Sequence, residues 1–328
     1  MLGSIATLLS TTSSNSAYPG DIAFLRLLGW LMREEPADVP AALRDALDHQ
    51  RVREHRLVGL AFATGLDEFR DDFIRIALSA ELWKKALAEV LHAFDAAGID
   101  ACRLKGCAYF LEVYEDPAHR SMSDLDILVR PEAFDEACKV LEQLGYATRT
   151  SKDFAHAPTH HALTFDRGHL TVDLHRNMMQ QGRSQIDIDG IWERANLADH
   201  RPAPLDEIAL HIGHVVRSEL MVPLATFVDL ARLMRQSNCG RQAILAHCDA
   251  FRFGRGARLV LAMHDLLREG RAGRAGPYPL PSVIELVHGQ AFPRLRTLLI
   301  KTILVQGPRE LVGLARTTLL ERSRRWQS

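Results

Sequence analysis

The stretch Ser123-Asp124-Leu125-Asp126-Ile127-Leu128-Val129 decides the expected fold. Apolar residues alternate with its two acids, which is the pattern of a β-strand with one apolar face. Side chains two residues apart lie on the same face of a strand, so Asp124 and Asp126 are expected on one face with Cα atoms roughly 6.6 Å apart. Two carboxylates placed in this way can share a divalent cation.

A third acid, Asp173, lies in a second strand pattern, Leu170-Thr171-Val172-Asp173-Leu174-His175. Three acids on adjacent strands repel one another unless cations neutralise them, and oxygen ligands suit Mg²⁺, which also binds phosphates. Two-metal phosphoryl or nucleotidyl transfer is the chemistry that such a trio serves. The alternative is that the D-x-D pair is only a solvated turn before a strand. The basic residue ahead of the pair, Arg120, and the acid and histidine of the second strand weaken this alternative, and from these residues alone both interpretations stay open.

The organisation of the chain changes twice along its length. Residues 1–20 are expected to be a flexible tail, residues 21–97 an N-terminal helical region, residues 98–200 an α/β core and residues 201–328 a C-terminal helical region. Within the core we expect a strand over 99–104, a helix from Pro131 to Leu144 and a hairpin over 161–175. These patterns predict an α+β protein with a small mixed sheet. The helical regions on either side would form the walls of an acceptor cleft.

Composition excludes several classes of protein. The 328 residues contain 40 Lys and Arg against 41 Asp and Glu, so the chain lacks the basic excess of a protein that binds nucleic acid over its whole surface. The five cysteines include no C-x-x-C pair and are odd in number, which indicates a reducing compartment. No apolar run approaches the roughly 20 residues of a membrane helix. We therefore expect a cytoplasmic protein without a membrane partner.

Several segments resemble those of a bacterial family of uncharacterised nucleotidyltransferases within the polymerase-β-like superfamily. They are Leu104-Lys105-Gly106-Cys107-Ala108, the run from Arg120 to Val129, and Val172-Asp173-Leu174-His175. The resemblance extends to the helix with His211 and His214 and to Val228-Asp229-Leu230. It implies the nucleotidyltransferase fold, in which a small mixed sheet carries three metal-binding acids and helical regions flank it.

The resemblance also implies roles for the three acids. Asp124 and Asp126 would be ligands of the two metal ions, Mg²⁺ or alternatively Mn²⁺, that hold a nucleoside triphosphate. Asp173 would be the third carboxylate, which coordinates the catalytic metal or activates the acceptor hydroxyl. ATP is the expected nucleotide.

Four more residues are candidates for binding the nucleotide. The superfamily carries a Gly-Gly or Gly-Ser turn after its first strand, whereas this chain has Lys105-Gly106, so the usual serine contact is not matched. Gly106 allows close backbone approach and Lys105 offers a charge to phosphate. Arg120 is the expected second phosphate contact, with an ion pair to a nearby acid as the alternative. His175 would contact a phosphate or orient the acid, with a purely structural hydrogen bond as the alternative.

His211 and His214 are three residues apart and lie on one helix face. They are candidates for the acceptor side of the cleft, with core histidines as the alternative. The sequence therefore predicts a Mg²⁺-dependent nucleotidyltransferase that transfers a nucleoside monophosphate to a small-molecule, RNA or protein acceptor and releases pyrophosphate. Two alternatives stay open at this point. One is a non-catalytic module of the same fold that binds a nucleotide or a partner, and the other is a toxin–antitoxin-type enzyme that modifies tRNA or protein.

Overall fold

The computed structural model describes residues 19–34, 39–149, 162–178, 186–277, 279–289 and 292–304, together with Gly307 and Val312. The expected tail lies outside these residues except for its last two, which begin the helix α2. No helix in these ranges is long and apolar enough to cross a membrane.

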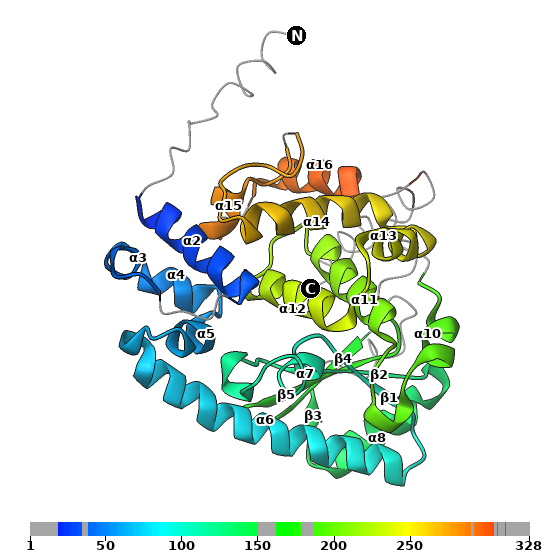
Figure 1. The fold of residues 1–328 in the computed structure, drawn as a ribbon. Coiled ribbons are helices and arrows are strands. Elements are labelled where there is room, and N and C mark those ends of the chain that lie inside the picture. Colours follow the sequence, from blue (N-terminus) through cyan, green and yellow to red (C-terminus); the bar gives the residue numbers. More distant parts are fainter. Residues whose placement is uncertain are drawn as a thin grey trace.

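The secondary structure follows the predicted order of helices, α/β unit and helices (Figure 1). The first helices are α2 (Pro19–Arg33), α3 (Ala41–Asp45), α4 (His49–Glu54), α5 (Val58–Ala63), η1 (Asp67–Phe69) and α6 (Arg70–Ala96). The α/β unit contains β1 (Ala101–Leu104), α7 (Lys105–Tyr109), η2 (Pro117–His119), β2 (Leu125–Val129), η3 (Pro131–Ala133), α8 (Phe134–Gln143), β3 (Ala147–Thr148), β4 (Ala162–Arg167) and β5 (Leu170–His175). The remaining helices are α10 (Ile188–Arg194), η4 (Leu197–Asp199), α11 (Pro204–Arg217), α12 (Ala225–Ser237), α13 (Arg241–Ala250), α14 (Gly254–Arg268), α15 (Val283–Val287) and α16 (Arg294–Leu304).

The five strands form one mixed sheet in the order β1-β2-β5-β4-β3. Strands β2 and β5 run parallel, and the other neighbouring pairs are antiparallel. The parallel pair brings the two predicted acid-bearing strands together at the centre of the sheet. The α+β prediction is therefore confirmed, including the hairpin of β4 and β5.

Helices α6 and α8 cover one face of the sheet. Helix α6 buries Trp83, Leu87, Val90 and Phe94 at steps of three and four residues, and these side chains share a core with the odd-numbered positions of β2. Gly98 ends this helix with a φ of 68°, which a glycine adopts without a side-chain clash. The apolar alternation that predicted β2 is thus explained by packing against these two helices.

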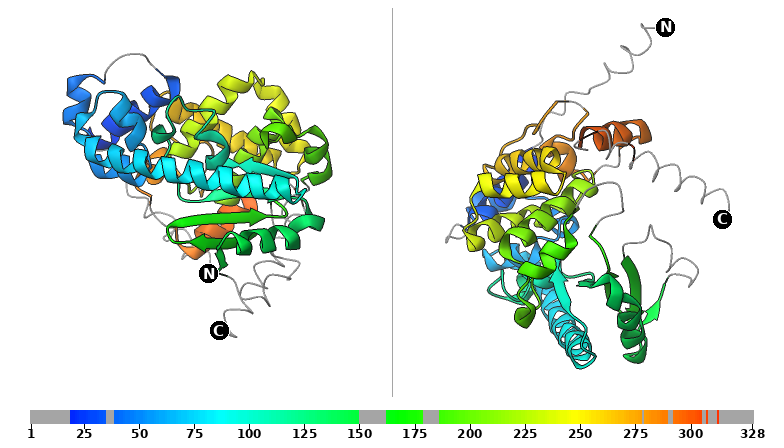
Figure 2. Two further views of the ribbon diagram at one scale, coloured as in Figure 1. Left: turned by 90° about the horizontal axis from the view of Figure 1, so that it is seen from below. Right: turned by 90° about the vertical axis from the view of Figure 1, so that its right-hand side faces the viewer.

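The other face of the sheet lies under the helices that come late in the chain (Figures 1 and 2). Helix α2 packs against α12 and α14, and its apolar side chains join theirs in a single core. The expectation that the two helical regions stand on either side of the α/β unit is therefore wrong for α2. Its face of Phe24, Leu27, Leu28 and Leu31 shares a core with the C-terminal helices, so these helices and α2 form one helical body, whereas α6 packs on the opposite face of the sheet.

Candidate active site

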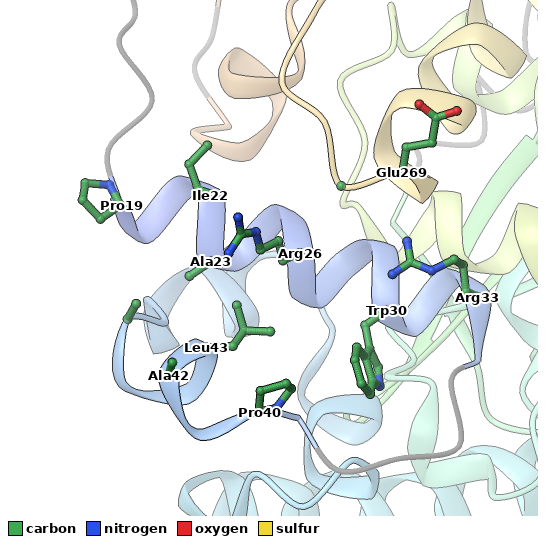
Figure 3. Close-up of a pocket in the computed structure, with 12 residues that line it drawn as sticks. Pro19, Ile22, Ala23, Arg26, Trp30, Arg33, Pro40, Ala42, Leu43 and Glu269 are labelled. Carbon is green, nitrogen blue, oxygen red and sulfur yellow. The ribbon is translucent and has the colours of Figure 1, made fainter.

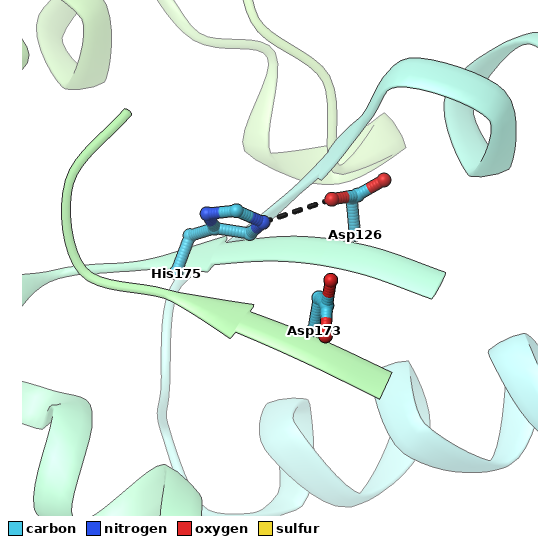
Figure 4. Close-up of side chains that lie close together, drawn as sticks. All are labelled: Asp126, Asp173 and His175. Atoms are coloured by element: carbon cyan, nitrogen blue, oxygen red, sulfur yellow. Dashed lines mark hydrogen bonds and ion pairs between the residues drawn. The ribbon is translucent and has the colours of Figure 1, made fainter. Parts of the chain in front are cut away.

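Asp126 and Asp173 lie side by side at the centre of the sheet (Figure 4). They are partners in the register of the parallel strands β2 and β5, and neighbouring strands are about 4.8 Å apart. Both side chains point away from the core under α6 and α8, because the alternate positions of their strands are buried there. The sequence prediction that strands bring these two acids together is met by this register.

His175 completes a compact group with these two acids. One ligand atom from each of Asp126, Asp173 and His175 lies within 4.8 Å of the other two. His175 Nε2 donates a hydrogen bond of 2.8 Å to Asp126 Oδ1 (Figure 4). Carboxylate oxygens and an imidazole nitrogen are donors that suit a divalent metal ion. Within the described residues, Asp126 Oδ2 accepts no hydrogen bond, so this oxygen is available as a ligand.

Lys105 is the second side chain that contacts the Asp126 carboxylate. Its ammonium contacts Asp126 Oδ1 at 2.5 Å, and the lysine has a φ of 50°, in the left-handed region that non-glycine residues seldom adopt. Burial acts to raise the pKa of Asp126, but the charge of Lys105 and the hydrogen bond from His175 outweigh it and hold that pKa well below its usual value. Asp126 is therefore ionised although only 3% of its surface is exposed.

Asp173 is positioned by the neighbouring strand. Thr164 on β4 stands opposite Asp173 in the register and donates a hydrogen bond of 2.6 Å from Oγ1 to Asp173 Oδ1. This bond fixes the carboxylate and leaves its second oxygen for other ligands. The alternation of the hairpin could have predicted this contact, because it places Thr164 on the same sheet face as Asp173.

Asp124 lies just outside β2, which begins at Leu125, and is not part of the group formed by Asp126, Asp173 and His175. Its Oδ1 accepts a hydrogen bond of 2.8 Å from Ser123. Burial, followed by the charge of Asp126, raises the pKa of Asp124. The acid nevertheless lines the same cavity as Asp126.

A cavity of about 210 Å³ separates this edge of the sheet from the helical body. Asp124, Asp126, Lys105 and Gly106 line it from the α/β unit. The other wall contains residues from α11, α12 and the end of α4: His211, His214, Thr226, Asp229 and Arg56. Most of the predicted site residues therefore face one polar cavity. Asp173 and His175 do not line the cavity, but both lie next to Asp126, which does.

Gly106 lies close against the loop before β2. A Cβ atom at this position would lie 3.2 Å from Met122 Sδ and 3.7 Å from Arg120 Nη2. A side chain here would therefore fill the space between the turn and the loop before β2. The predicted close approach of a ligand to this backbone is compatible with that geometry.

Arg120 forms a buried ion pair with Asp229 on α12. Its Nε lies 2.9 Å from Asp229 Oδ1, and its Nη2 lies 2.9 Å from Asp229 Oδ2. Tyr114 donates a further hydrogen bond of 2.6 Å to Asp229 Oδ1. Burial lowers the pKa of Arg120, but Asp229 more than compensates and raises it. Arg120 thus lines the cavity while its guanidinium is held by a protein carboxylate, as in the ion-pair alternative.

The two predicted cleft histidines have different surroundings. His211 is bound through both ring nitrogens, to Thr226 O at 2.8 Å and to the Tyr109 hydroxyl at 3.1 Å, so it joins α11 to α12 and α7. His214 lies near Lys105, and its Nδ1 is buried without a hydrogen-bond partner among the described residues. Burial lowers the pKa of His214 to about 3, so the ring is neutral at physiological pH. Both histidines line the cavity.

A larger cavity of about 570 Å³ lies elsewhere, between α2, α3 and the end of α14 (Figure 3). Its wall is mainly apolar and includes Ile22, Trp30 and Leu43, with Arg26 and Glu269 at its edges. None of the predicted site residues lines it, so size alone does not identify the site in this molecule.

Asp126 and Asp173 thus lie on neighbouring strands of a small mixed sheet, and Asp126 faces a charged cavity. The sequence model of a family described as uncharacterised nucleotidyltransferase matches residues 46–268, more than half of the chain, and the chain belongs to this family. The resemblance found in the motifs is thereby confirmed, and the protein is a nucleotidyltransferase by class. The matched range includes parts of both helical regions as well as the α/β unit.

Among solved structures, the chain is similar to the solution structure of the antibiotic-resistance factor ANT(2'')-Ia. The two share 15% sequence identity with a TM-score of 0.35, and the similarity covers 51% of this chain and 89% of that chain. No similar protein was found among curated proteins.

Sequence reasoning did not find two residues of the site. Arg56 follows a short helix far from the motifs, and nothing in its local sequence indicates that it reaches the sheet. Asp229 stands in a segment that resembles the family, but nothing in that segment indicates that it pairs with Arg120. Contacts between segments more than a hundred residues apart are set by the packing of the helical body, which no local pattern encodes.

Proposed function

We propose that the protein is a metal-dependent nucleotidyltransferase that transfers a nucleoside monophosphate from a nucleoside triphosphate to an acceptor and releases pyrophosphate. The observation that carries the proposal is the pair of Asp126 and Asp173 on parallel strands with His175 beside them, all three with ligand atoms within 4.8 Å of one another. Family membership supplies the class of reaction.

Asp126, Asp173 and His175 would hold the metal ion. When bound, a divalent cation neutralises phosphate charge and polarises the reacting phosphoryl group. Mg²⁺ is the expected ion, since two of the three ligands are carboxylates, and the imidazole also suits Mn²⁺. Asp124 is placed to bind a second ion from the cavity side, because it faces the same space as Asp126.

The other residues of the α/β unit would bind and orient the triphosphate, with ATP as the expected donor. Lys105 supplies a positive charge beside Asp126, and Gly106, which lines the cavity without a side chain, would allow phosphate oxygens close to the backbone. In the reaction the acceptor oxygen forms a bond to the α-phosphorus as the bond to the β-phosphate oxygen breaks. Asp173 would take the acceptor proton, and the hydrogen bond from Thr164 would hold its carboxylate in place.

The second candidate is a module that binds a nucleotide without transferring it. The ion pair between Lys105 and Asp126 favours it, because this contact already neutralises one metal-binding carboxylate. The two candidates differ in whether product is formed.

Incubation with each α-labelled nucleoside triphosphate, Mg²⁺ or Mn²⁺ and a cell extract separates the two candidates. The enzyme should transfer label to a small molecule, RNA or protein, and the variant with Asp126→Asn and Asp173→Asn should not. Failure of the native protein to transfer label from any of the nucleotides, while it still binds one of them, would establish the binding module instead.

A further inference from the structure

Three cationic side chains face the cavity between the sheet and the helical body, and two of them are paired. Lys105 is paired with Asp126, and Arg120 is paired with Asp229. The third is Arg56, which donates a hydrogen bond of 3.1 Å from Nη1 to Ser123 Oγ. In the part of the chain that the structure describes, no carboxylate forms an ion pair with Arg56. Among these three cations, Arg56 is therefore the one without a direct ion-pair partner in the described residues.

Arg56 also has an unfavourable backbone conformation for its residue type. It follows α4 with a φ of 59°, in the left-handed region. Its N–H donates to Arg53 O at 3.0 Å, and the next N–H, of Leu57, donates to Val52 O at 2.9 Å. Glycine is strongly preferred at this position of such a helix ending. A non-glycine residue in a strained conformation beside a candidate site indicates a function for its side chain.

The neighbouring residue fixes the backbone of Arg56 against the helical body. His55 is buried, and its Nε2 donates to Val287 O at 2.8 Å. Its Nδ1 accepts from the N–H of Leu224 at 3.2 Å, and its carbonyl accepts from the N–H of Ala225 at the start of α12. The segment that carries Arg56 is thus built into the cavity wall and is not an independent surface loop.

The electrostatic surroundings favour an anionic ligand. Burial, followed by the charge of Arg120, lowers the pKa of Arg56, and the charges of Asp124 and Asp229 oppose this only in part. An oxyanion in the cavity would offset both effects, and a guanidinium can bind it with two parallel hydrogen bonds. The only side-chain partner of Arg56 among the described residues is the neutral hydroxyl of Ser123.

We propose that Arg56 binds an oxyanion group of a substrate in this cavity, so that the N-terminal helices supply one side of the substrate site. The assignment of the ligand as a substrate rests on the proposed function. The group is a phosphate or a carboxylate, and it belongs either to the nucleotide or to an acceptor that is itself anionic. The sequence predicted that the first helical region forms a wall of the cleft, and the proposal names Arg56 as the residue of that region that contacts the substrate.

The variant Arg56→Gly tests the proposal without disturbing the fold, because glycine suits the backbone at this position. Arg252→Gly is the matched control. Arg252 follows α13 with a φ of 65°, the same pattern of backbone hydrogen bonds ends that helix, and the residue lies outside the cavity. Thermal unfolding should show that both variants are folded. Each should be at least as stable as the alanine variant at the same position, because alanine does not suit a positive φ.

Calorimetric titration with inorganic tripolyphosphate in the absence of metal gives the readout. We expect Arg56→Gly to weaken binding about 10- to 100-fold, the effect of losing charged hydrogen bonds, and Arg252→Gly to leave it unchanged. Equal affinity in Arg56→Gly and the native protein, or no binding by the native protein, would overturn the proposal. Since this titration requires neither metal nor turnover, its result is independent of whether transfer occurs.

A second titration identifies the source of the anion. If Arg56 binds the phosphate chain of the nucleotide, Arg56→Gly will also weaken binding of a non-hydrolysable ATP analogue with Mn²⁺. If Arg56 binds the acceptor, the analogue will bind normally, and the variant will weaken only the binding of inorganic phosphate to the protein saturated with the analogue. If Arg56→Gly has the affinity of the native protein in both titrations, both assignments are contradicted.

Discussion

Two buried carboxylates face the same cavity from opposite walls, yet their partners differ. Asp229 on α12 is 1% exposed, and both of its oxygens accept hydrogen bonds from Arg120, with Tyr114 as an additional donor. Asp126 on β2 is 3% exposed, and a single oxygen receives both Lys105 and His175. The first carboxylate is satisfied by the protein. The second keeps an oxygen for a ligand, and Asp173 lies beside it.

This difference separates a structural ion pair from a candidate catalytic group. A buried charge pair contributes little net stability, but the loss of one partner leaves the other buried and unpaired. A carboxylate with an available oxygen in a polar cavity can instead bind a cation. The two acids should therefore respond differently to the same kind of substitution.

Asp126→Asn should produce the largest functional effect. We expect nucleotidyl transfer to fall by about 10³-fold or more, since removal of a preorganised charge from a reacting centre commonly has an effect of that order. The fold should persist, because Lys105 reaches the cavity and its ammonium can be solvated there. Pyrophosphate release and thermal unfolding measure the two properties. A variant with lower stability but undiminished specific activity would reverse the roles assigned to Asp126 and Asp229.

Asp229→Ala should produce the largest effect on stability. Arg120 and Tyr114 would be left buried without their acceptor, which costs about 3–5 kcal/mol of unfolding free energy. Urea denaturation measures this change, and Lys139→Ala provides a control in a solvent-exposed ion pair, where no measurable change is expected. Loss of activity in Asp229→Ala with undiminished stability would show that Asp229 belongs to the reaction.

His214 should make the helical wall sensitive to acid. Its folded-state pKa of about 3 lies below the ordinary value of 6.5, so the unfolded state takes up the proton first. The associated stability is present above about pH 6.5 and is lost as the pH falls toward 3. We expect a loss of about 1–2 kcal/mol between pH 7 and pH 5, which His214→Asn should reduce. Urea denaturation at both pH values measures this loss. If the unfolding free energy of His214→Asn falls between pH 7 and pH 5 by as much as that of the native protein, the assignment to His214 is contradicted.

Thr164→Val should have the smallest effect of the series. It removes the hydrogen bond to Asp173 Oδ1 while it preserves the shape of the side chain. A neutral-to-charged hydrogen bond of this kind corresponds to about a 10-fold change in turnover. Steady-state kinetics should show a lower kcat for Thr164→Val and recovery in Thr164→Ser. A kcat that Thr164→Ser fails to restore would mean that the hydroxyl does not position Asp173.

The sequence predicted the sheet wall of the cavity better than the helical wall. Alternation in β2 and β5 placed Asp126, Asp173 and His175 on one sheet face, because a strand has a fixed two-residue period. It did not predict that β2 begins after Asp124, since the boundary of a strand depends on pairing with its neighbours.

The helical wall depends on contacts between distant segments. Arg120 and Asp229 are 109 residues apart, and Arg56 reaches the cavity because His55 is bound to the N-terminal end of α12 and to the end of α15. Helical periodicity predicts which face of each helix is apolar, but not which helices pack together. The merging of α2 with the C-terminal helices was missed for the same reason.

The central claim is that the sheet wall binds a metal ion together with a nucleotide. Calorimetric titration with a non-hydrolysable ATP analogue tests this claim, first with Mn²⁺ and then with a chelator. The titration is made on the native protein, on Asp126→Asn and on the control Asp265→Asn, in which the changed acid is half-exposed on α14. Binding should require Mn²⁺, persist in Asp265→Asn and fall by at least about 100-fold in Asp126→Asn. Equally tight binding in the chelator, or in Asp126→Asn, would contradict the account.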